Sequence, residues 1–268
     1  MIGFLSIIAI GFFLGMRHAT DPDHVIAVTT IVSRQNKVSR AALTGIFWGI
    51  GHTLTILVVG TAIILFGVVI PARIGLSMEF SVAIMLLVLG VMNVAAFMRA
   101  ARAMAKVEHA AVAVHTHHHS HGDYIHTHAH GHAPESHPHS PDGTPLARMD
   151  GYFGSGTIYR QLRPLLVGTV HGLAGSAAVA LLVLTTIRDP RWAIAYLLLF
   201  GIGTVAGMML ITMSIASAFT FFGRKHANFS GRLGLASGLL SLAFGLLLVY
   251  QIGIAGGLFT GHPQWTPR

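Results

Sequence analysis

The sequence contains no cysteine and has an unusually small share of charged residues. Without cysteine, the chain can form no disulfide framework and can offer no thiolate ligand to a metal ion. Only 10% of its 268 residues are charged, whereas soluble domains usually have about 25%. Because so few charged side chains cannot solvate the surface of a water-soluble domain, this composition indicates a protein embedded in lipid.

The sequence contains several long apolar segments. Hydrophobic residues make up 53% of the chain, and the mean hydropathy is +0.67. A helix of roughly 20 apolar residues crosses a hydrocarbon core of ~30 Å. The segments that reach this length are 41–70, 77–98, 165–187, 192–222 and 233–253. Their apolar residues run continuously instead of alternating, which excludes the strands of a membrane β-barrel.

The positive charges are distributed unevenly between the loops. The segments 34–40, 99–163 and 224–232 hold 12 of the 17 Lys and Arg residues, and the alternate loops hold few. Cytoplasmic loops carry such an excess, so these three are predicted to be cytoplasmic. The net charge of +8 therefore reflects membrane topology and does not indicate nucleic acid as a partner. The first 16 residues have no basic n-region and no cleavage site, so no cleaved signal peptide is expected.

Residues 99–163 differ in composition from the rest of the chain. The stretch 109–139 contains 12 of the 18 histidines, interspersed with Pro, Ser and Gly, and lacks the apolar periodicity of a packed core. We predict a disordered, metal-binding cytoplasmic loop over 99–163, between the segments 1–98 and 164–268. Its predicted metal-binding residues are His115, His117, His118, His119, His121, His126, His128, His130 and His132.

The two flanking segments resemble copies of one three-span unit. The matched pairs, in the same order and with nearly the same separation, are His18 and His171, Trp48 and Phe200, and Gly90 and Gly245. Because each copy has an odd number of spans, the second copy is inverted relative to the first, as in many transporters. We therefore predict an all-α polytopic membrane protein of about six transmembrane helices, built as two inverted three-helix repeats.

The N-terminal region 2–33 is too long to be one upright helix, since at ~1.5 Å per residue it would measure about 48 Å. Asp21-Pro22 interrupts it, because proline removes a helical hydrogen bond and an Asp-Pro pair is a helix-start signal. We predict two half-helices, 2–17 and 22–33, that together form one crossing with the N-terminus outside. Two separate crossings would instead give seven spans.

Ionisable residues are concentrated at this break, namely Arg17, His18, Asp21, Asp23 and His24. Each charge at membrane depth costs ~2.5–3.5 kcal/mol on insertion scales, so the cluster indicates a function. Two carboxylates and two imidazoles suit Ni²⁺, Co²⁺ or Zn²⁺, whereas Cu(I) prefers sulfur ligands. The alternative is an Asp–His–Arg network that only caps the broken helix. A cap needs one Asp, so we predict a metal site formed by His18, Asp21, Asp23 and His24.

Two further histidines lie within predicted spans. His52 follows Gly51, and His171 occupies the repeat position of His18. Small neighbours let helices approach closely, so we predict His52 as a metal ligand and His171 as a residue of the pathway. Either ring could instead make a hydrogen bond across helices. Asn93, Ser176 and Thr204 are further pathway candidates, although each could equally join two helices.

These residues carry a resemblance to a known family. The pattern His18-x4-Asp23-His24 resembles the signature of the nickel/cobalt transporter family, Gly51-His52-Thr53 is similar to its second motif, and Ala206-Gly207-Met208 resembles a later stretch. The resemblance is greatest to urease-accessory-type nickel permeases. It implies a Ni²⁺ or Co²⁺ permease in which His18, Asp23, His24 and His52 are functional. Long members carry Asp-Thr-Ala-Thr-Glu in the second half, whereas residues 173–178 contain no acid.

The sequence thus predicts a secondary transporter, and not an enzyme, that moves Ni²⁺ or Co²⁺ across the cytoplasmic (inner) membrane. Import is favoured, since a dication moving inward gains ~4.6 kcal/mol per 100 mV. No cofactor is expected, and no Gly-x4-Gly-Lys-Ser/Thr motif for ATP is present. A cytoplasmic metal acceptor could be a partner. The alternatives are a Ni/Co efflux permease and a membrane metalloenzyme with histidine-bound iron.

Overall fold

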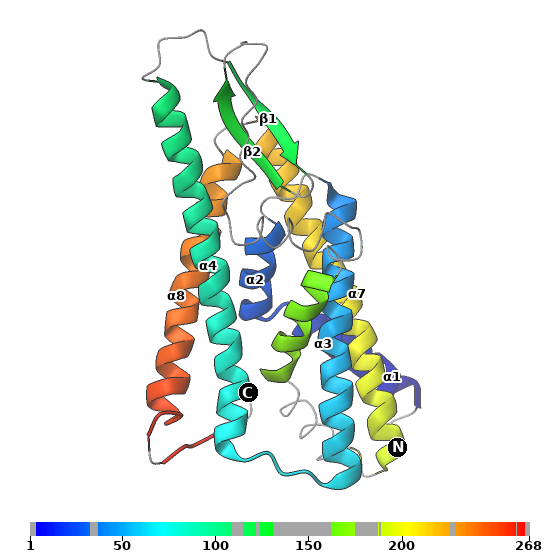
Figure 1. Cartoon of the computed structure of the whole chain (residues 1–268). Helices are drawn as coiled ribbons and strands as arrows, with labels where there is room; N and C mark the ends of the chain where they lie inside the picture. The colour runs from blue at the N-terminus through cyan, green and yellow to red at the C-terminus, as the bar shows by residue number, and fades with distance from the viewer. Residues whose placement is uncertain are drawn as a thin grey trace.

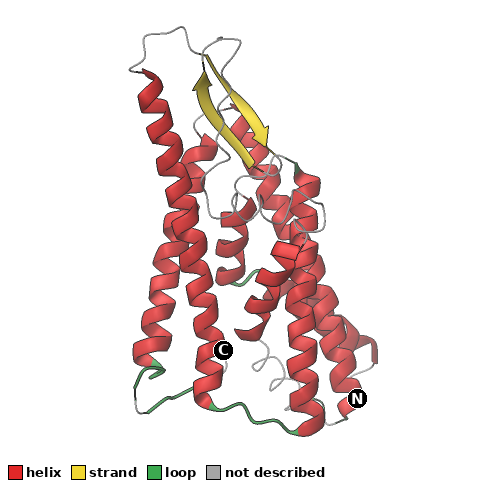
Figure 2. Cartoon of the chain, in the orientation of Figure 1, coloured by secondary structure: helices red, strands yellow, loops and turns green. Residues whose placement is uncertain are grey.

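The computed structural model describes residues 4–32, 37–108, 115–121, 124–130, 162–174, 187, 189–225, 229–260 and 262–265. Its helices are α1 (Phe4–His18), α2 (Pro22–Val32), α3 (Val38–Phe66), α4 (Ala72–Glu108), α7 (Pro190–Lys225) and α8 (Phe229–Val249), and residues 162–174 are also helical. A π-helical segment, η1 (Tyr250–Ala255), continues α8. The long helices run side by side along one axis, as Figures 1 and 2 show.

Four helices of the described part of the chain have the length and hydropathy of membrane crossings. They cover Val38–Phe66, Ala72–Arg99, Pro190–Phe221 and Arg232–Ala255. Each coincides with one of the predicted spans 41–70, 77–98, 192–222 and 233–253, although the first of these helices ends four residues earlier than predicted, at Phe66. The fifth predicted span, 165–187, lies partly outside the described residues, and its portion 165–174 is helical. Outward-facing apolar side chains, such as Val58 at 62% exposed, suit a lipid environment.

The predicted break in the first crossing is present. The helix α1 ends at His18 and α2 begins at Pro22, with a turn between them. The backbone N–H of Asp21 donates to the carbonyl of His18 (3.0 Å), and the Asp21 carbonyl accepts the first α2 hydrogen bond from Val25 (3.1 Å). Proline suits this position because its missing N–H would have no helical partner there. Since α2 has only 11 residues, it is too short to cross a membrane alone.

The half-helix α2 lies inside the bundle. It contacts α4, α7 and α8, and Ala27 and Val28 in its middle are fully buried. Trp48 of α3 and Met208 of α7 belong to the same buried cluster. The middle of α2 is therefore packed inside protein, whereas the break itself is partly open, since Ala19 is buried but Thr20 and Pro22 are exposed.

The order of contacts sets the direction of the central helices. Gly45 in α3 lies against Met208 in α7, whereas Thr53 lies against Gly201, so α3 and α7 are antiparallel. A Cβ on Gly11 would approach Tyr196, and one on Gly207 would approach Met16, so α1 runs parallel to α7.

Helix 162–174 runs parallel to α3, because Gly168 lies against Trp48 and Gly172 against Thr55. Since α1 is parallel to α7, and α7 is antiparallel to α3, it follows that α1 and helix 162–174 run in opposite directions.

Close contacts between backbones recur at matched positions of the two halves. A Cβ on Gly15 would overlap the carbonyl of Phe200, and a Cβ on Gly168 would overlap the carbonyl of Trp48. In the same way, a Cβ on Gly203 would overlap the carbonyl of Phe12, and a Cβ on Gly51 would overlap the carbonyl of Leu165. In the α4–α8 pair, a Cβ on Gly90 would meet Leu242 at 2.7 Å, and a Cβ on Gly245 would meet Leu87 at 2.9 Å.

The histidine-rich segment differs from the disordered loop predicted over 99–163. The helix α4 continues to Glu108, and two antiparallel strands follow, β1 (His115–His121) and β2 (Tyr124–His130). The prediction considered only whether the segment could bury a core and missed its period-two alternation of histidine with Thr, Ser and Ala, which suits paired strands. The hairpin, yellow in Figure 2, lies at one end of the molecule, and the membrane-crossing part of the described chain is helical, as predicted.

Candidate metal centre

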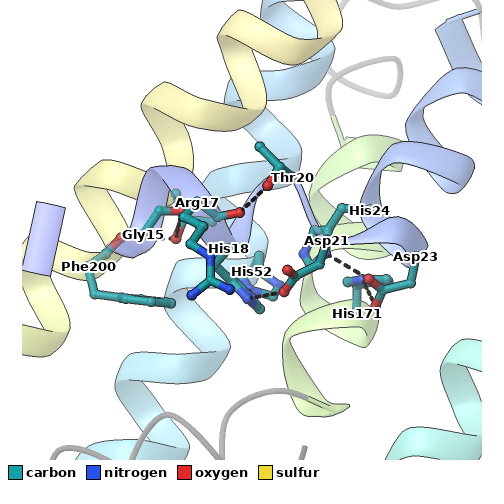
Figure 3. Close-up of polar contacts among 11 residues, drawn as sticks. Gly15, Arg17, His18, Thr20, Asp21, Asp23, His24, His52, His171 and Phe200 are labelled. Atoms are coloured by element: carbon teal, nitrogen blue, oxygen red, sulfur yellow. Dashed lines mark hydrogen bonds and ion pairs between the residues drawn. The ribbon is translucent and has the colours of Figure 1, made fainter. Parts of the chain in front are cut away.

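Four histidines converge at the break between α1 and α2 (Figure 3). His18 ends α1, His24 lies in the first turn of α2, His52 is midway along α3, and His171 is near the end of helix 162–174. The ring centroid of His24 lies 4.8 Å from that of His18, 5.0 Å from that of His52 and 4.2 Å from that of His171. Three separate parts of the sequence therefore contribute to one cluster.

The rings of His18 and His52 meet through their Nε2 atoms, which lie 3.0 Å apart. Two nitrogens bound to one metal ion at ~2.1 Å and at a right angle are also about 3.0 Å apart. The ligand atoms offered by His18, His24 and His52 all lie within 4.8 Å of one another. A single dication between these three imidazoles would thus require only small side-chain adjustments.

The carboxylate of Asp23 faces two other imidazoles. Its Oδ1 lies 3.2 Å from Nδ1 of His24, and its Oδ2 lies 3.0 Å from Nε2 of His171. The ligand atoms of Asp23, His24 and His171 again lie within 4.8 Å of one another. The break at Pro22 allows this arrangement, because in an unbroken helix Asp23 would point away from His18 and His24.

Asp21 lies behind His18 and outside both groups. Its Oδ2 is 2.7 Å from Nδ1 of His18, and its side chain is 47% exposed. A carboxylate on Nδ1 holds the ring proton there and leaves the Nε2 lone pair of His18 directed toward His52. Asp21 therefore contacts His18 and belongs to neither group, whereas the sequence predicted it as a ligand.

Several nitrogens of this cluster are buried without a hydrogen-bond partner among the described residues. They are Nε2 of His24 and the Nδ1 atoms of His52 and His171, and each of these side chains is at most 2% exposed. An unsatisfied buried polar atom costs about 1–3 kcal/mol and is rare in native proteins. The unpaired Nε2 of His24, which lies between the two groups of side chains, fits a site whose ligand is a metal ion.

Two buried aromatic residues, one from each half of the chain, lie beside the cluster. The ring of Phe200 lies 5.3 Å from that of His18, and the ring of Trp48 lies 5.7 Å from that of His171. Trp48 and Phe200 are matched positions in the two halves, as are His18 and His171. These aromatic residues were not among the predicted site residues, although their matched positions beside two histidines are a signal visible in the sequence.

The other pathway candidates lie at helix contacts. The Asn93 side chain in α4 donates to the Thr30 carbonyl of α2 (3.1 Å) and to Oγ of Ser237 in α8 (3.3 Å). The Thr204 hydroxyl lies within hydrogen-bond distance of the Phe200 and Gly15 carbonyl oxygens (2.9 and 3.3 Å). Both residues join helices and are in neither ligand group.

Ser176 and His132 lie outside the described residues. The other predicted loop ligands are in the two strands, namely His115, His117, His118, His119 and His121 in β1 and His126, His128 and His130 in β2.

Comparison with known proteins adds a family to this geometry. The family model described as high-affinity nickel-transport protein matches residues 4–252. A urease accessory protein, UreH, of Bacillus sp. (strain TB-90) is 36% identical over 258 residues, which cover 96% of each of the two chains. No solved structure matches the chain.

Proposed function

Because the chain belongs to the family of high-affinity nickel-transport proteins, we propose that it imports Ni²⁺ across the cytoplasmic membrane through the centre at the break between α1 and α2. The chain is a nickel permease and not an enzyme, and Ni²⁺ is its transported substrate rather than a cofactor. The observation that carries the proposal is the convergence of His18, Asp23, His24 and His52 at a break in an otherwise apolar crossing.

The donor set supports a divalent transition metal as the ion at this centre. Imidazole nitrogen is a ligand that suits Ni²⁺, and the Asp23 carboxylate offsets part of the charge of the ion in the protein interior. The set contains no sulfur ligand, which Cu(I) prefers. The cation also lies near the N-terminus of α2, whose helix dipole is positive and would repel it. Asp23, in the first turn of α2, offsets that repulsion. Asp21 acts as an outer residue by orienting His18.

The two halves of the chain support an alternating-access mechanism. Gly15 against Phe200 and Gly168 against Trp48 are the same contact exchanged between halves, and α1 and helix 162–174 run in opposite directions. Such reciprocity is what an inverted pair of three-helix repeats would produce, with the site at their interface. Rocking of one repeat against the other would then expose the centre first to one side of the membrane and then to the other.

The direction of transport rests on topology and energetics. The Lys- and Arg-rich segments 34–40, 99–163 and 224–232 favour a cytoplasmic position for the ends of the helices next to them. The histidine hairpin lies at that end of the molecule in Figure 1. A potential that is negative inside favours inward movement of a dication by ~4.6 kcal/mol per 100 mV, so import needs no nucleotide.

The hairpin would act as a metal buffer on the cytoplasmic side. His117 and His128 are directly paired across β1 and β2, as are His119 and His126. Neutral imidazoles bind metal, so its affinity should rise as the pH passes ~6.5. Such a surface could take up ions that leave the centre and pass them to a cytoplasmic acceptor.

A flux assay tests the proposed function. Purified protein in liposomes should accumulate Ni²⁺ faster when a potassium diffusion potential makes the interior negative, and His24→Gln should abolish the accumulation. His262→Gln is the matched control, because His262 is exposed and lies in the C-terminal segment, outside the cluster. Undiminished uptake by the His24 variant would refute the assignment of the site, and faster exit than entry under this potential would refute import.

A further inference from the structure

The centre contains two overlapping groups of ligands instead of one shell. His18, His24 and His52 form the first group, and Asp23, His24 and His171 form the second. The first is made only of imidazoles, whereas the second includes a carboxylate. His24 belongs to both. An ion in the first group would therefore have a different set of donor atoms from an ion in the second.

The residues that distinguish the groups approach from opposite directions. His18 ends α1, and His171 is near the end of helix 162–174, which runs the opposite way. Each is accompanied by the matched aromatic residue of the other half, Phe200 for His18 and Trp48 for His171. Because His18, His24 and His52 all belong to the first half, a movement of one half against the other would change the distance from His24 to His171 and leave the first group nearly unchanged.

Resting on the proposed function, we propose that Ni²⁺ crosses the centre by ligand exchange between two sites that share His24. One site uses His18 and His52, and the other uses Asp23 and His171. Only one ion occupies the pair at a time, because two dications separated by the width of one imidazole ring would repel each other strongly in a low-dielectric interior. His171 is then a direct ligand for half of the transport cycle.

The ring of His24 can serve both sites because it has two nitrogens. Its Nδ1 lies 3.2 Å from Asp23, in the second group, and its Nε2 is buried without a hydrogen-bond partner among the described residues. A neutral imidazole carries one proton and offers a lone pair at the other nitrogen. An ion that moves from Nε2 to Nδ1 therefore requires the Nδ1 proton to leave to water and another proton to arrive from water at Nε2, so that the ring carries one proton before and after the step.

Single-residue variants can distinguish a centre with two sites from a centre with one shell of ligands. The experiment uses full-length protein in which serine replaces the 12 histidines of 109–139, so that the hairpin no longer binds Ni²⁺. In this background, His52→Gln leaves the second site complete, and His171→Gln leaves the first complete. Each variant should bind Ni²⁺ with at most about a hundredfold loss of affinity, while Ni²⁺ flux into liposomes falls more than about tenfold.

X-ray absorption of the bound Ni²⁺ supplies the readout that a structural role would not change. The His171 variant should show three imidazoles, and the His52 variant two imidazoles and one carboxylate. The proposal would be overturned if the His171 variant transported Ni²⁺ as fast as the wild type. It would also be overturned if one Ni²⁺ in the wild-type protein were bound by all four imidazoles. Binding and flux that survive His24→Gln would instead refute the proposed function itself, which distinguishes the two failures. His262→Gln again serves as the control for loss of a histidine.

Discussion

Replacement of Asp23 by asparagine tests the electrostatics of the centre while keeping its shape. The carboxylate of Asp23 faces His24 and His171 at 3.2 and 3.0 Å, and its side chain is 30% exposed. Asparagine has nearly the same volume, but it removes one negative charge and one of the two acceptor oxygens. The matched variant is Asp21→Asn, which makes the same chemical change where the carboxylate contacts His18 and belongs to neither ligand group.

The expected magnitudes differ because the two carboxylates differ in position and exposure. A unit charge pair ~4 Å apart interacts by about 4 kcal/mol at an effective dielectric constant near 20, and a dication doubles this to about 8 kcal/mol as an upper bound. If partial exposure of Asp23 halves that value, about 4 kcal/mol is lost, which is about a thousandfold in Ni²⁺ affinity. Asp21 is 47% exposed and orients a ligand, so its replacement should cost about 10–100-fold.

Titration of Ni²⁺ into the purified variants, with the hairpin histidines replaced, measures both affinities directly. Thermal unfolding in the same detergent would show that neither variant has lost its fold, because surface and half-exposed substitutions of equal volume usually change stability little. An Asp21 variant that loses as much affinity as the Asp23 variant, or more, would refute the assignment of Asp21 as an outer residue and Asp23 as a ligand.

Three further predictions concern packing and the hairpin. Gly168→Val should lower the unfolding temperature, since its side chain would overlap the Trp48 carbonyl and overpacking typically costs about 1–3 kcal/mol; unchanged stability would contradict the close helix contact. Trp265→Phe removes the 2.8 Å hydrogen bond to Glu79 and should cost about 1 kcal/mol without changing Ni²⁺ flux. Deletion of 115–130 should remove the Ni²⁺ binding that increases above pH ~6.5, measured by equilibrium dialysis, while flux persists. Loss of all flux would show instead that the hairpin is part of the pathway.

The parts of the fold that depend on local chemistry could be predicted from the sequence. The spans follow from continuous apolar runs, and the break follows from proline at position 22, because each is decided within a few residues. Matched residues also predicted two related halves, with His171 at the repeat position of His18.

Long-range geometry was harder to predict. Asp21 and Asp23 are two residues apart and chemically identical, yet one contacts His18 and the other contacts His24 and His171. That difference depends on the angle between α1 and α2 and on the position of helix 162–174, which no local pattern encodes. The histidine hairpin was missed because its strands pair without an apolar face, the signal on which the prediction of disorder relied.

X-ray absorption at the nickel edge of full-length protein in lipid nanodiscs, loaded with less than one Ni²⁺ per chain, tests the central claim most directly. With the hairpin histidines replaced in every sample, the wild-type centre should show imidazole nitrogens from the buried cluster, and His24→Gln should remove them. A nickel shell of water and carboxylate oxygens alone, or one that His24→Gln leaves unchanged, would contradict the assignment of the transported ion to the break between α1 and α2.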